Sequence, residues 1–387
     1  MEGVKMKNTH KVRAAFNEAN RERLEAIVRS QGDTSVLKNV SPSFIIMDLT
    51  WRCNYECMSC IDKKAVVSEK DAKGLPSVDM PLEIIEDIFD YSKRHNVRGI
   101  MTMGGEVFTY DEGIRLALAK SAEFKIPLKT VSNGSHLGKY ADLIEGAYKL
   151  PGSMLRVSVN AGRNRYHEQT GQITEALYDD VFESITDITT RGVPMFVSTV
   201  VFPSSADDSN IDELDEITSS CEAAGISSMI FLPGRDPEAM KRYRYTDGEK
   251  EYLANLQSRH GKVKIYMEDV LKPDSEVFDQ NLNMPCYAAY LYSLIGSNGD
   301  VYVCSDHRGN PDAVLGKLKG KGDFAKFWHS EERVKGQQAF RPACQCKEMT
   351  CIKYDILERF DELCDEYDKT GMIPKNLVVS DIPESFF

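Results

Sequence analysis

The sequence lacks three features that would assign it to whole classes of protein. It has no apolar run of the roughly 20 residues that a membrane-spanning helix needs. Residues 1–29 are charged and lack the apolar core of a signal peptide. The overall net charge is -12 and the sequence has no extended basic patch, which argues against a nucleic-acid-binding surface. We therefore expect a cytoplasmic protein that binds neither membranes nor nucleic acids.

Cysteine, by contrast, is abundant, with 10 in a chain of 387 residues. Without a signal peptide, a disulfide framework is not expected at this length, so metal or redox chemistry is the better interpretation. Three of the cysteines fall within residues 53–60 and five within residues 286–351, whereas Cys221 and Cys364 stand apart. This clustering predicts two separate cysteine sites.

The middle of the chain alternates apolar runs with amphipathic stretches. The runs predict six strands, at residues 44–49, 99–103, 128–132, 155–160, 195–201 and 228–232. The stretches between them predict helices, at residues 81–95, 111–124, 140–149, 174–191 and 210–224. This alternation predicts an α/β fold with a parallel sheet covered by helices, in which functional sites gather at the carboxyl ends of the strands.

The flanking regions carry weaker signals. Residues 9–30 predict one amphipathic helix, and residues 352–367 predict another. A short strand is expected at residues 263–267. Two apolar runs, 290–295 and 301–303, are joined through an Asn-Gly pair, which is a strong hairpin signal.

The first cysteine group has three and two residues between its members, Cys53, Cys57 and Cys60, directly after a predicted strand. Three thiolates on a tight loop can hold a cubane iron–sulfur cluster and leave one iron open to a small molecule. Zinc with a fourth ligand from elsewhere in the chain is the alternative.

Residues 48–60, Asp-Leu-Thr-Trp-Arg-Cys-Asn-Tyr-Glu-Cys-Met-Ser-Cys, resemble the signature of the radical S-adenosylmethionine (SAM) superfamily. Ser59 departs from the aromatic residue usual before the last cysteine. The resemblance implies a partial (β/α)6 TIM barrel and a [4Fe-4S] cluster whose open iron binds SAM. It also implies cleavage of SAM to a 5′-deoxyadenosyl radical that abstracts a substrate hydrogen.

The resemblance extends to three strand ends. Gly104, Gly105 and Glu106 resemble the family's Gly-Gly-Glu motif, in which glycines admit the SAM amino group and the carboxylate accepts its hydrogen bonds. Asn133 resembles the residue of an Asn-Gly turn beneath SAM.

A further stretch, residues 156–171, begins within the fourth predicted strand and also resembles a segment of the family. It implies that Ser158 and Asn160 face the methionine or ribose portion of SAM. Asn160 stands where an Asp is common and Thr170 where an Arg is common.

The second cysteine group, with its predicted hairpin, resembles the SPASM or Twitch auxiliary-cluster domain. A full SPASM domain has seven cysteines, so a Twitch domain with one auxiliary [4Fe-4S] cluster fits better. The ligands that the resemblance implies are Cys286, Cys304, Cys346 and Cys351, with Cys344 as the alternate. Cys364 is either a buried helical thiol or a ligand of a second auxiliary cluster.

These expectations divide the chain into four parts. Residues 1–42 form an N-terminal helical extension, 43–235 the radical SAM barrel, 236–284 a connecting region, and 285–387 the Twitch/SPASM-like domain with a C-terminal helix. The charged residues nearest the predicted strand ends and the second cysteine group are candidates for substrate contact: Arg235, Asp236, Asp306, His307 and Arg308.

The resulting hypothesis is a radical SAM oxidoreductase, a dehydrogenase of a sugar-like or aminocyclitol-like small molecule. A closed auxiliary cluster suits removal of the second electron, and an electron donor such as flavodoxin or ferredoxin would supply the first. The alternatives are a maturase that forms crosslinks or thioethers in a peptide substrate, an epimerase, and a zinc-binding module without catalysis.

Overall fold

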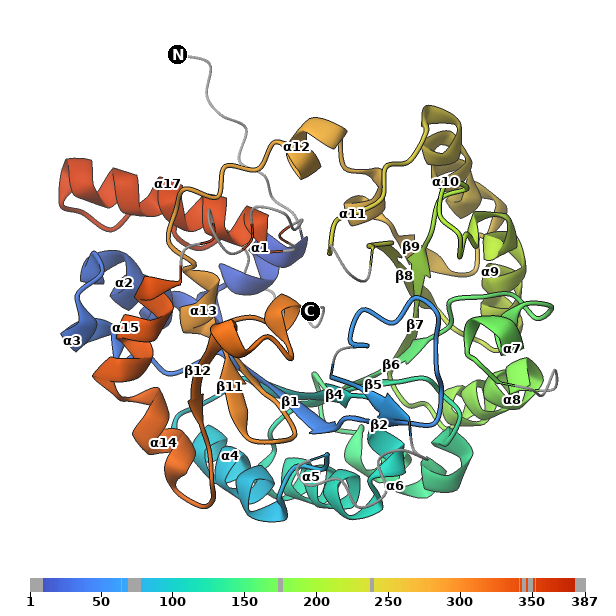
Figure 1. The fold of residues 1–387 in the computed structure, drawn as a ribbon, viewed down its shortest axis with the longest axis horizontal. Coiled ribbons are helices and arrows are strands. Elements are labelled where there is room, and N and C mark those ends of the chain that lie inside the picture. The colour runs from blue at the N-terminus through green and yellow to red at the C-terminus, as the bar shows by residue number, and fades with distance from the viewer. Residues whose placement is uncertain are drawn as a thin grey trace.

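The computed structural model describes residues 10–63, 65–68, 78–172, 177–236, 240–340, 342, 346, 351 and 353–379. Within them, ten strands form one sheet in the order β12-β11-β10-β1-β4-β5-β6-β7-β8-β9. Every neighbouring pair from β10 to β9 is parallel, whereas β10, β11 and β12 pair antiparallel. The sheet curves around the molecule inside a ring of helices, as a partial TIM barrel (Figure 1).

The strands of the sheet have the following bounds: β1 (Phe44–Thr50), β4 (Gly99–Gly104), β5 (Leu128–Ser132), β6 (Met154–Ser158), β7 (Met195–Val201), β8 (Ser228–Pro233), β9 (Lys264–Tyr266), β10 (Tyr292–Ile295), β11 (Asp300–Tyr302) and β12 (Val314–Lys317). A separate two-stranded sheet pairs β2 (Arg52–Cys53) with β3 (Val67–Ser68). The six predicted strands and the predicted fold class are therefore confirmed, with strand ends within two residues of those expected.

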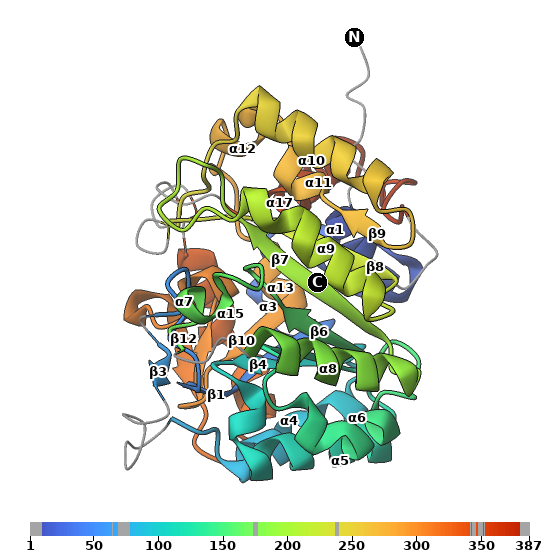
Figure 2. The same cartoon turned by 90° about the vertical axis from the view of Figure 1, so that its right-hand side faces the viewer.

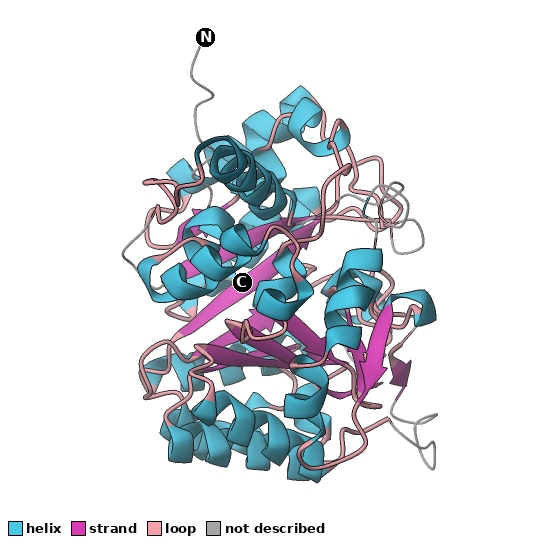
Figure 3. Ribbon diagram, turned by 90° about the vertical axis from the view of Figure 1, so that its left-hand side faces the viewer, coloured by secondary structure: helices cyan, strands magenta, loops and turns pink. Residues whose placement is uncertain are grey.

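Helices cover the outer face of the barrel: α4 (Leu82–Arg94), α5 (Asp111–Phe124), α6 (Ala141–Ala147), α8 (Leu177–Thr190), α9 (Leu214–Ala223) and α10 (Asp247–Arg259). Figures 2 and 3 show them stacked against the strands. Alternate strand residues such as Leu155 and Val157 point outward into this helix layer and are fully buried there. The residues between them, such as Arg156 and Ser158, consequently face the barrel interior.

Shorter helices complete the described fold: α7 (Tyr166–Gln169), α11 (Glu268–Leu271), α12 (Asp274–Phe278), α13 (Ala288–Leu291), α14 (Asp323–Trp328) and α15 (Glu331–Ala339). 3-10 turns follow several strands, among them η2 (Val107–Thr109). No helix of the described residues is both long and apolar enough to cross a membrane.

The prediction of one helix over residues 9–30 was wrong. The structure divides this segment into α1 (His10–Ala15), a 3-10 turn (Glu18–Asn20) and α2 (Arg21–Ser30), followed by α3 (Thr34–Leu37). Asn17 and Asn20 are buried, and their side-chain amides donate to the Ala14 and Ala15 carbonyls. Asparagine side chains compete with the helical backbone in this way, and they end the helix.

The C-terminal helix α17 (Tyr354–Thr370) lies beside this N-terminal segment (Figure 1). Phe360 of α17 packs against Phe16, with ring centroids 4.8 Å apart. The two ends of the described chain therefore share one apolar cluster.

The predicted hairpin forms, with Leu294 opposite Tyr302 and Gly299 in the left-handed region at φ +84°. Its first strand, β10, pairs directly with β1 of the barrel, Phe44 opposite Tyr292. The strands on either side of residue 285 thus belong to one sheet.

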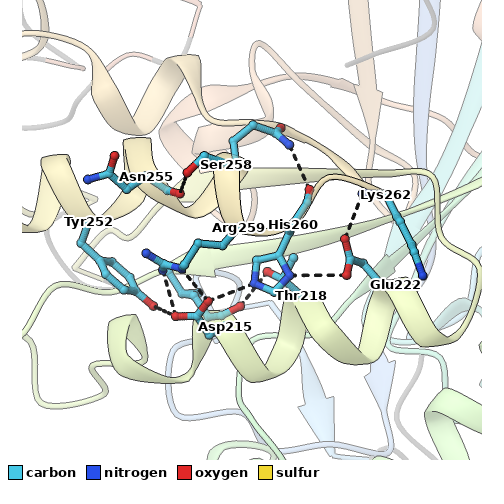
Figure 4. A network of polar contacts seen from close by, with 11 residues as sticks. Asp215, Thr218, Glu222, Tyr252, Asn255, Ser258, Arg259, His260 and Lys262 are labelled. Carbon is cyan, nitrogen blue, oxygen red and sulfur yellow. Dashed lines mark hydrogen bonds and ion pairs between the residues drawn. The ribbon is translucent and has the colours of Figure 1, made fainter.

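Polar contacts join α9 and α10, two neighbouring helices of the outer layer (Figure 4). Asp215 on α9 accepts hydrogen bonds from Tyr252 and Arg259 on α10 and lies 2.9 Å from His260 Nε2. None of its members is among the predicted site residues, so we assign the network to stability.

Candidate SAM-cluster site and second cysteine site

The structure brings the first three cysteines together on the loop that follows β1. Cys53 closes β2, and the loop folds so that the Cys60 amide donates to the Cys57 carbonyl at 3.3 Å. The pKa values of Cys53 and Cys57 are raised to about 12, chiefly by burial, and the charge of the neighbouring Cys60 contributes to both shifts. Three free, half-buried thiols that sense one another's charge form a suitable ligand set for a metal cluster.

The spacing of these thiols bears on what they could hold. In the described part of the chain, no three Cys, His, Asp or Glu side chains are placed to share a single metal ion. Each thiolate of a cubane binds a different iron, so such ligands need not be that close together.

The cysteine loop is fixed by the segment that follows β6. The Glu56 amide donates to the Thr170 carbonyl at 2.9 Å, and the Met58 amide donates to the Gln169 carbonyl at 3.1 Å. Gly171 has φ +67° and lies against Glu56, where a Cβ atom would collide with the Glu56 backbone. Thr170, considered at first for its departure from the family arginine, therefore supports the loop through its backbone.

Gly104 and Gly105 lie against the chain that enters the cysteine loop. Gly104 has φ +131°, and a Cβ at either glycine would overlap the carbonyl oxygen of Thr50 or Arg52. The Gly105 amide donates to the Thr50 carbonyl at 2.8 Å. In this structure, glycine is needed for a close approach of β4 to the end of β1.

Glu106 is fully buried and joins the ends of β4 and β5. Its carboxylate accepts from the Phe108 amide at 3.1 Å, the Ser132 hydroxyl at 3.0 Å and the Asn133 amide at 2.6 Å. Burial raises the pKa of Glu106 to about 7, against the effect of these three donors. The Asn133 side chain in turn donates to Asn54 Oδ1 at 2.9 Å. A chain of hydrogen bonds therefore links the Gly-Gly-Glu turn to the cysteine loop.

A pocket opens beside the cysteine loop, with about 380 Å³ of space including its mouth. Three residues expected to contact SAM, Asn133, Ser158 and Asn160, line it together with Cys57. The sequence analysis did not single out the other lining residues for this role: Tyr55, Ser59, Ala161, Tyr166, Gln169 and Thr170.

Two polar groups of the pocket bear on its capacity for a ligand. Gln169 Nε2 is buried and has no hydrogen-bond partner among the described residues. Asn160 Oδ1 accepts from the Val200 amide at 2.9 Å, so the Asn160 amide nitrogen is available to a ligand in the pocket. An unsatisfied buried donor is costly unless a ligand completes it, so the residues present fit a polar ligand such as SAM.

The structure also brings together the second cysteine group. Cys286, Cys304 and Cys346 pack against one small apolar cluster that contains Val303 and Phe340. Burial raises the pKa of Cys286 to about 12 and raises that of Cys351 still further, and Cys304 adds to both. The four preferred ligands are therefore neighbours.

Two further side chains lie beside these four thiols. His307 Nε2 lies 3.3 Å from Cys346 Sγ, and the buried Lys353 Nζ lies 3.7 Å from Cys304 Sγ. Cys344, the alternate ligand, lies outside the described residues. Cys364 is buried within α17.

The segment after Cys304 reaches the first cysteine loop through Arg308. Arg308 Nε lies 2.6 Å from Asp48 Oδ2, and Arg308 Nη1 lies 2.6 Å from Asp62 Oδ1. Asp48 precedes Cys53 by five residues, and Asp62 follows Cys60 by two residues. One buried guanidinium thus joins both ends of the first cysteine loop to the second cysteine site.

The other charged candidates are also engaged by the protein. Arg235, just after β8, lies 3.5 Å from Asp306 and both side chains are largely buried. With His307 beside Cys346, these residues lie between the barrel mouth and the second cysteine group. Asp236 forms backbone contacts with residues 240–241.

Comparison with known proteins agrees with this geometry. Residues 47–217 match the sequence model of the radical SAM superfamily. No curated protein sequence matches the chain.

Two solved structures share its fold. Streptococcus suis SuiB bound to precursor peptide SuiA has a TM-score of 0.58 at 15% identity, with 78% of this chain and 67% of that chain covered. Native anSMEcpe with bound AdoMet has a TM-score of 0.53 at 13% identity, with 81% and 88% covered.

Proposed function

Because the chain carries a radical SAM superfamily domain over residues 47–217, we propose that it is a radical SAM dehydrogenase of a hydroxyl- or amino-bearing small molecule. The supporting observation is the second group of thiols, Cys286, Cys304, Cys346 and Cys351, gathered apart from the first three. Four protein thiolates would leave no iron of an auxiliary [4Fe-4S] cluster open, which suits the cluster to electron transfer. A Twitch-like region from residue 285 onward is part of the same proposal.

In this proposal Cys53, Cys57 and Cys60 hold the SAM-binding cluster, and the pocket beside Cys57 holds SAM. Asn133, Ser158 and Asn160 contact SAM from the ends of β5 and β6. Glu106 positions Asn133 through the 2.6 Å hydrogen bond to its amide. The buried surroundings exclude water from the reacting atoms.

When bound, the clusters and SAM would supply one-electron chemistry that removes a hydrogen atom from the substrate and then one further electron, with a proton released to water, so that an alcohol would become a carbonyl compound.

Reductive SAM cleavage tests the proposal. We expect the anaerobically reconstituted protein to form 5′-deoxyadenosine together with an oxidised product from one of a panel of sugars and aminocyclitols. Deoxyadenosine formation that is never coupled to substrate oxidation would contradict the dehydrogenase assignment.

A second candidate is modification of a peptide. It is favoured by the similarity to SuiB bound to its precursor peptide and to anSMEcpe bound to the Cp18Cys peptide. A crosslinked, thioether-containing or epimerised peptide, with no oxidised small molecule, would support this candidate instead.

A further inference from the structure

One partly buried cation inside the barrel differs from the buried arginines of the described chain. Arg156 lies on β6, with Leu155 and Val157 on either side pointing outward into the helix layer. Its Nε donates to the Ser198 hydroxyl of β7 at 2.8 Å. Arg156 therefore extends into the barrel, two residues before the pocket residue Ser158 on the same strand.

The guanidinium of Arg156 has no carboxylate partner among the described residues. Burial is the cause that lowers the pKa of Arg156, to about 10, and no acidic group opposes it. At neutral pH the side chain is still a cation. The neighbours directly beside it in the sheet, Val131 and Phe196, are apolar.

Two buried arginines show how a guanidinium is paired elsewhere in this protein. Arg308 contacts two carboxylates. Arg333, fully buried, donates to the Trp328 carbonyl and the Gln337 side chain as well as to a third acceptor. Arg156, by comparison, uses only Nε, and its two terminal nitrogens have no acceptor in the described structure.

A guanidinium held among apolar neighbours loses part of its hydration, and arginine cannot lose its proton to avoid that cost. An oxyanion that accepts from both terminal nitrogens would remove the cost, because the planar fork matches a carboxylate or phosphate. Because only Nε of Arg156 donates to the Ser198 hydroxyl, its two terminal nitrogens remain available to such an anion.

We propose that Arg156 binds the carboxylate or phosphate group of an anionic small-molecule substrate inside the barrel. This inference rests on the proposed function, since it assumes that the barrel holds the substrate. Two residues of strand separate Arg156 from Ser158, or about 7 Å. The anionic end of the substrate therefore lies deeper in the barrel than the SAM pocket, and the reacting carbon lies toward the pocket.

Thermal unfolding of the reconstituted protein tests this proposal without any turnover. The probes are inorganic phosphate and acetate, compared with chloride at equal ionic strength. At ten times the dissociation constant we expect a rise of about 2 °C for the wild type with at least one probe. Arg156→Gln and Arg156→Met should show no rise.

The matched control is Arg115→Gln, which removes an exposed arginine on α5 that pairs with Asp111. It should respond to the probes as the wild type does. The proposal is overturned if the wild type responds to neither probe, or if both Arg156 variants respond like the wild type.

A separate measurement distinguishes substrate from cofactor. SAM binding to Arg156→Gln, followed by equilibrium dialysis, should match the wild type within about twofold. A loss of SAM affinity greater than tenfold would overturn the proposal by assigning Arg156 to the SAM carboxylate. Neither test requires turnover. The anion site can therefore be found even if the proposed dehydrogenase activity is refuted, and the activity can be found even if the anion site is refuted.

Discussion

Replacing Arg308 by methionine removes both ion pairs that join the first cysteine loop to the segment after Cys304. Arg308 is 3% exposed and Asp48 is 0% exposed, so the pair between them is not screened by solvent. Removing one member of such a pair leaves an uncompensated buried carboxylate, which costs about 3–5 kcal/mol. At about 2.1 cal/mol/K per residue, 387 residues give an unfolding entropy of about 0.8 kcal/mol/K. We therefore expect the melting temperature to fall by about 4–6 °C.

The same substitution should also change the first cluster itself. Without the guanidinium, the negative charge of Asp62 next to the cysteine loop is uncompensated, which lowers the reduction potential of a cluster held there. An anaerobic redox titration followed by electron paramagnetic resonance measures this shift. Arg308→Lys keeps the charge but cannot contact both carboxylates as a fork, so its potential should lie between the two.

The control for this prediction is Arg191→Met, which removes a partly exposed ion pair with Asp187 at the carboxyl end of α8. It should leave the potential unchanged. If Arg308→Met melts within 1 °C of the wild type and keeps its potential, Arg308 does not support the cluster loop as described.

Three further predictions concern single residues. Cys57→Ala should abolish reductive SAM cleavage, measured as 5′-deoxyadenosine, while it leaves the iron of the second site in place; normal deoxyadenosine formation would refute the assignment of the loop. Cys304→Ala should preserve SAM cleavage but block formation of the oxidised product, and persistent turnover would show that the second site is not the electron acceptor. Burial lowers the pKa of Lys129 to about 7 in the folded protein, whereas the unfolded chain has the ordinary value of 10.5. Protonation of Lys129 therefore lowers the free energy of unfolding, fully below pH 7 and less and less as the pH rises toward 10.5. Lys129→Met should therefore be more stable than the wild type at pH 7, by up to about 5 kcal/mol, and the advantage should shrink in melts at pH 9.5; a less stable variant at pH 7 would contradict this reasoning.

The barrel could be predicted from the sequence because its strands and helices obey simple periodicities. Outward-facing residues such as Leu155 and Val157 produce the apolar runs, and the helix layer that buries them produces the amphipathic stretches. Hydrogen bonds in which a side chain competes with the helical backbone could not be predicted from these periodicities. Asn17 and Asn20 end the N-terminal helix through contacts with backbone carbonyls that hydrophobic spacing does not register.

The two cysteine groups could also be predicted, because ligand spacing is a local property of the chain. Contacts between distant segments could not. The ion pairs of Arg308 join residues separated by 246 and 260 positions, and no sequence pattern indicates such partners. Arg156 was visible in the sequence only as an arginine in a strand that is otherwise apolar or small. Its lack of a carboxylate partner among the described residues could be found only from the structure of the barrel.

The most direct test of the whole account is the iron and acid-labile sulfide content of the anaerobically reconstituted protein. Two [4Fe-4S] clusters predict about eight of each per chain, with about four remaining when Cys53, Cys57 and Cys60 are all replaced by alanine. Zinc in place of iron, or an iron content unchanged by that triple substitution, would contradict the account.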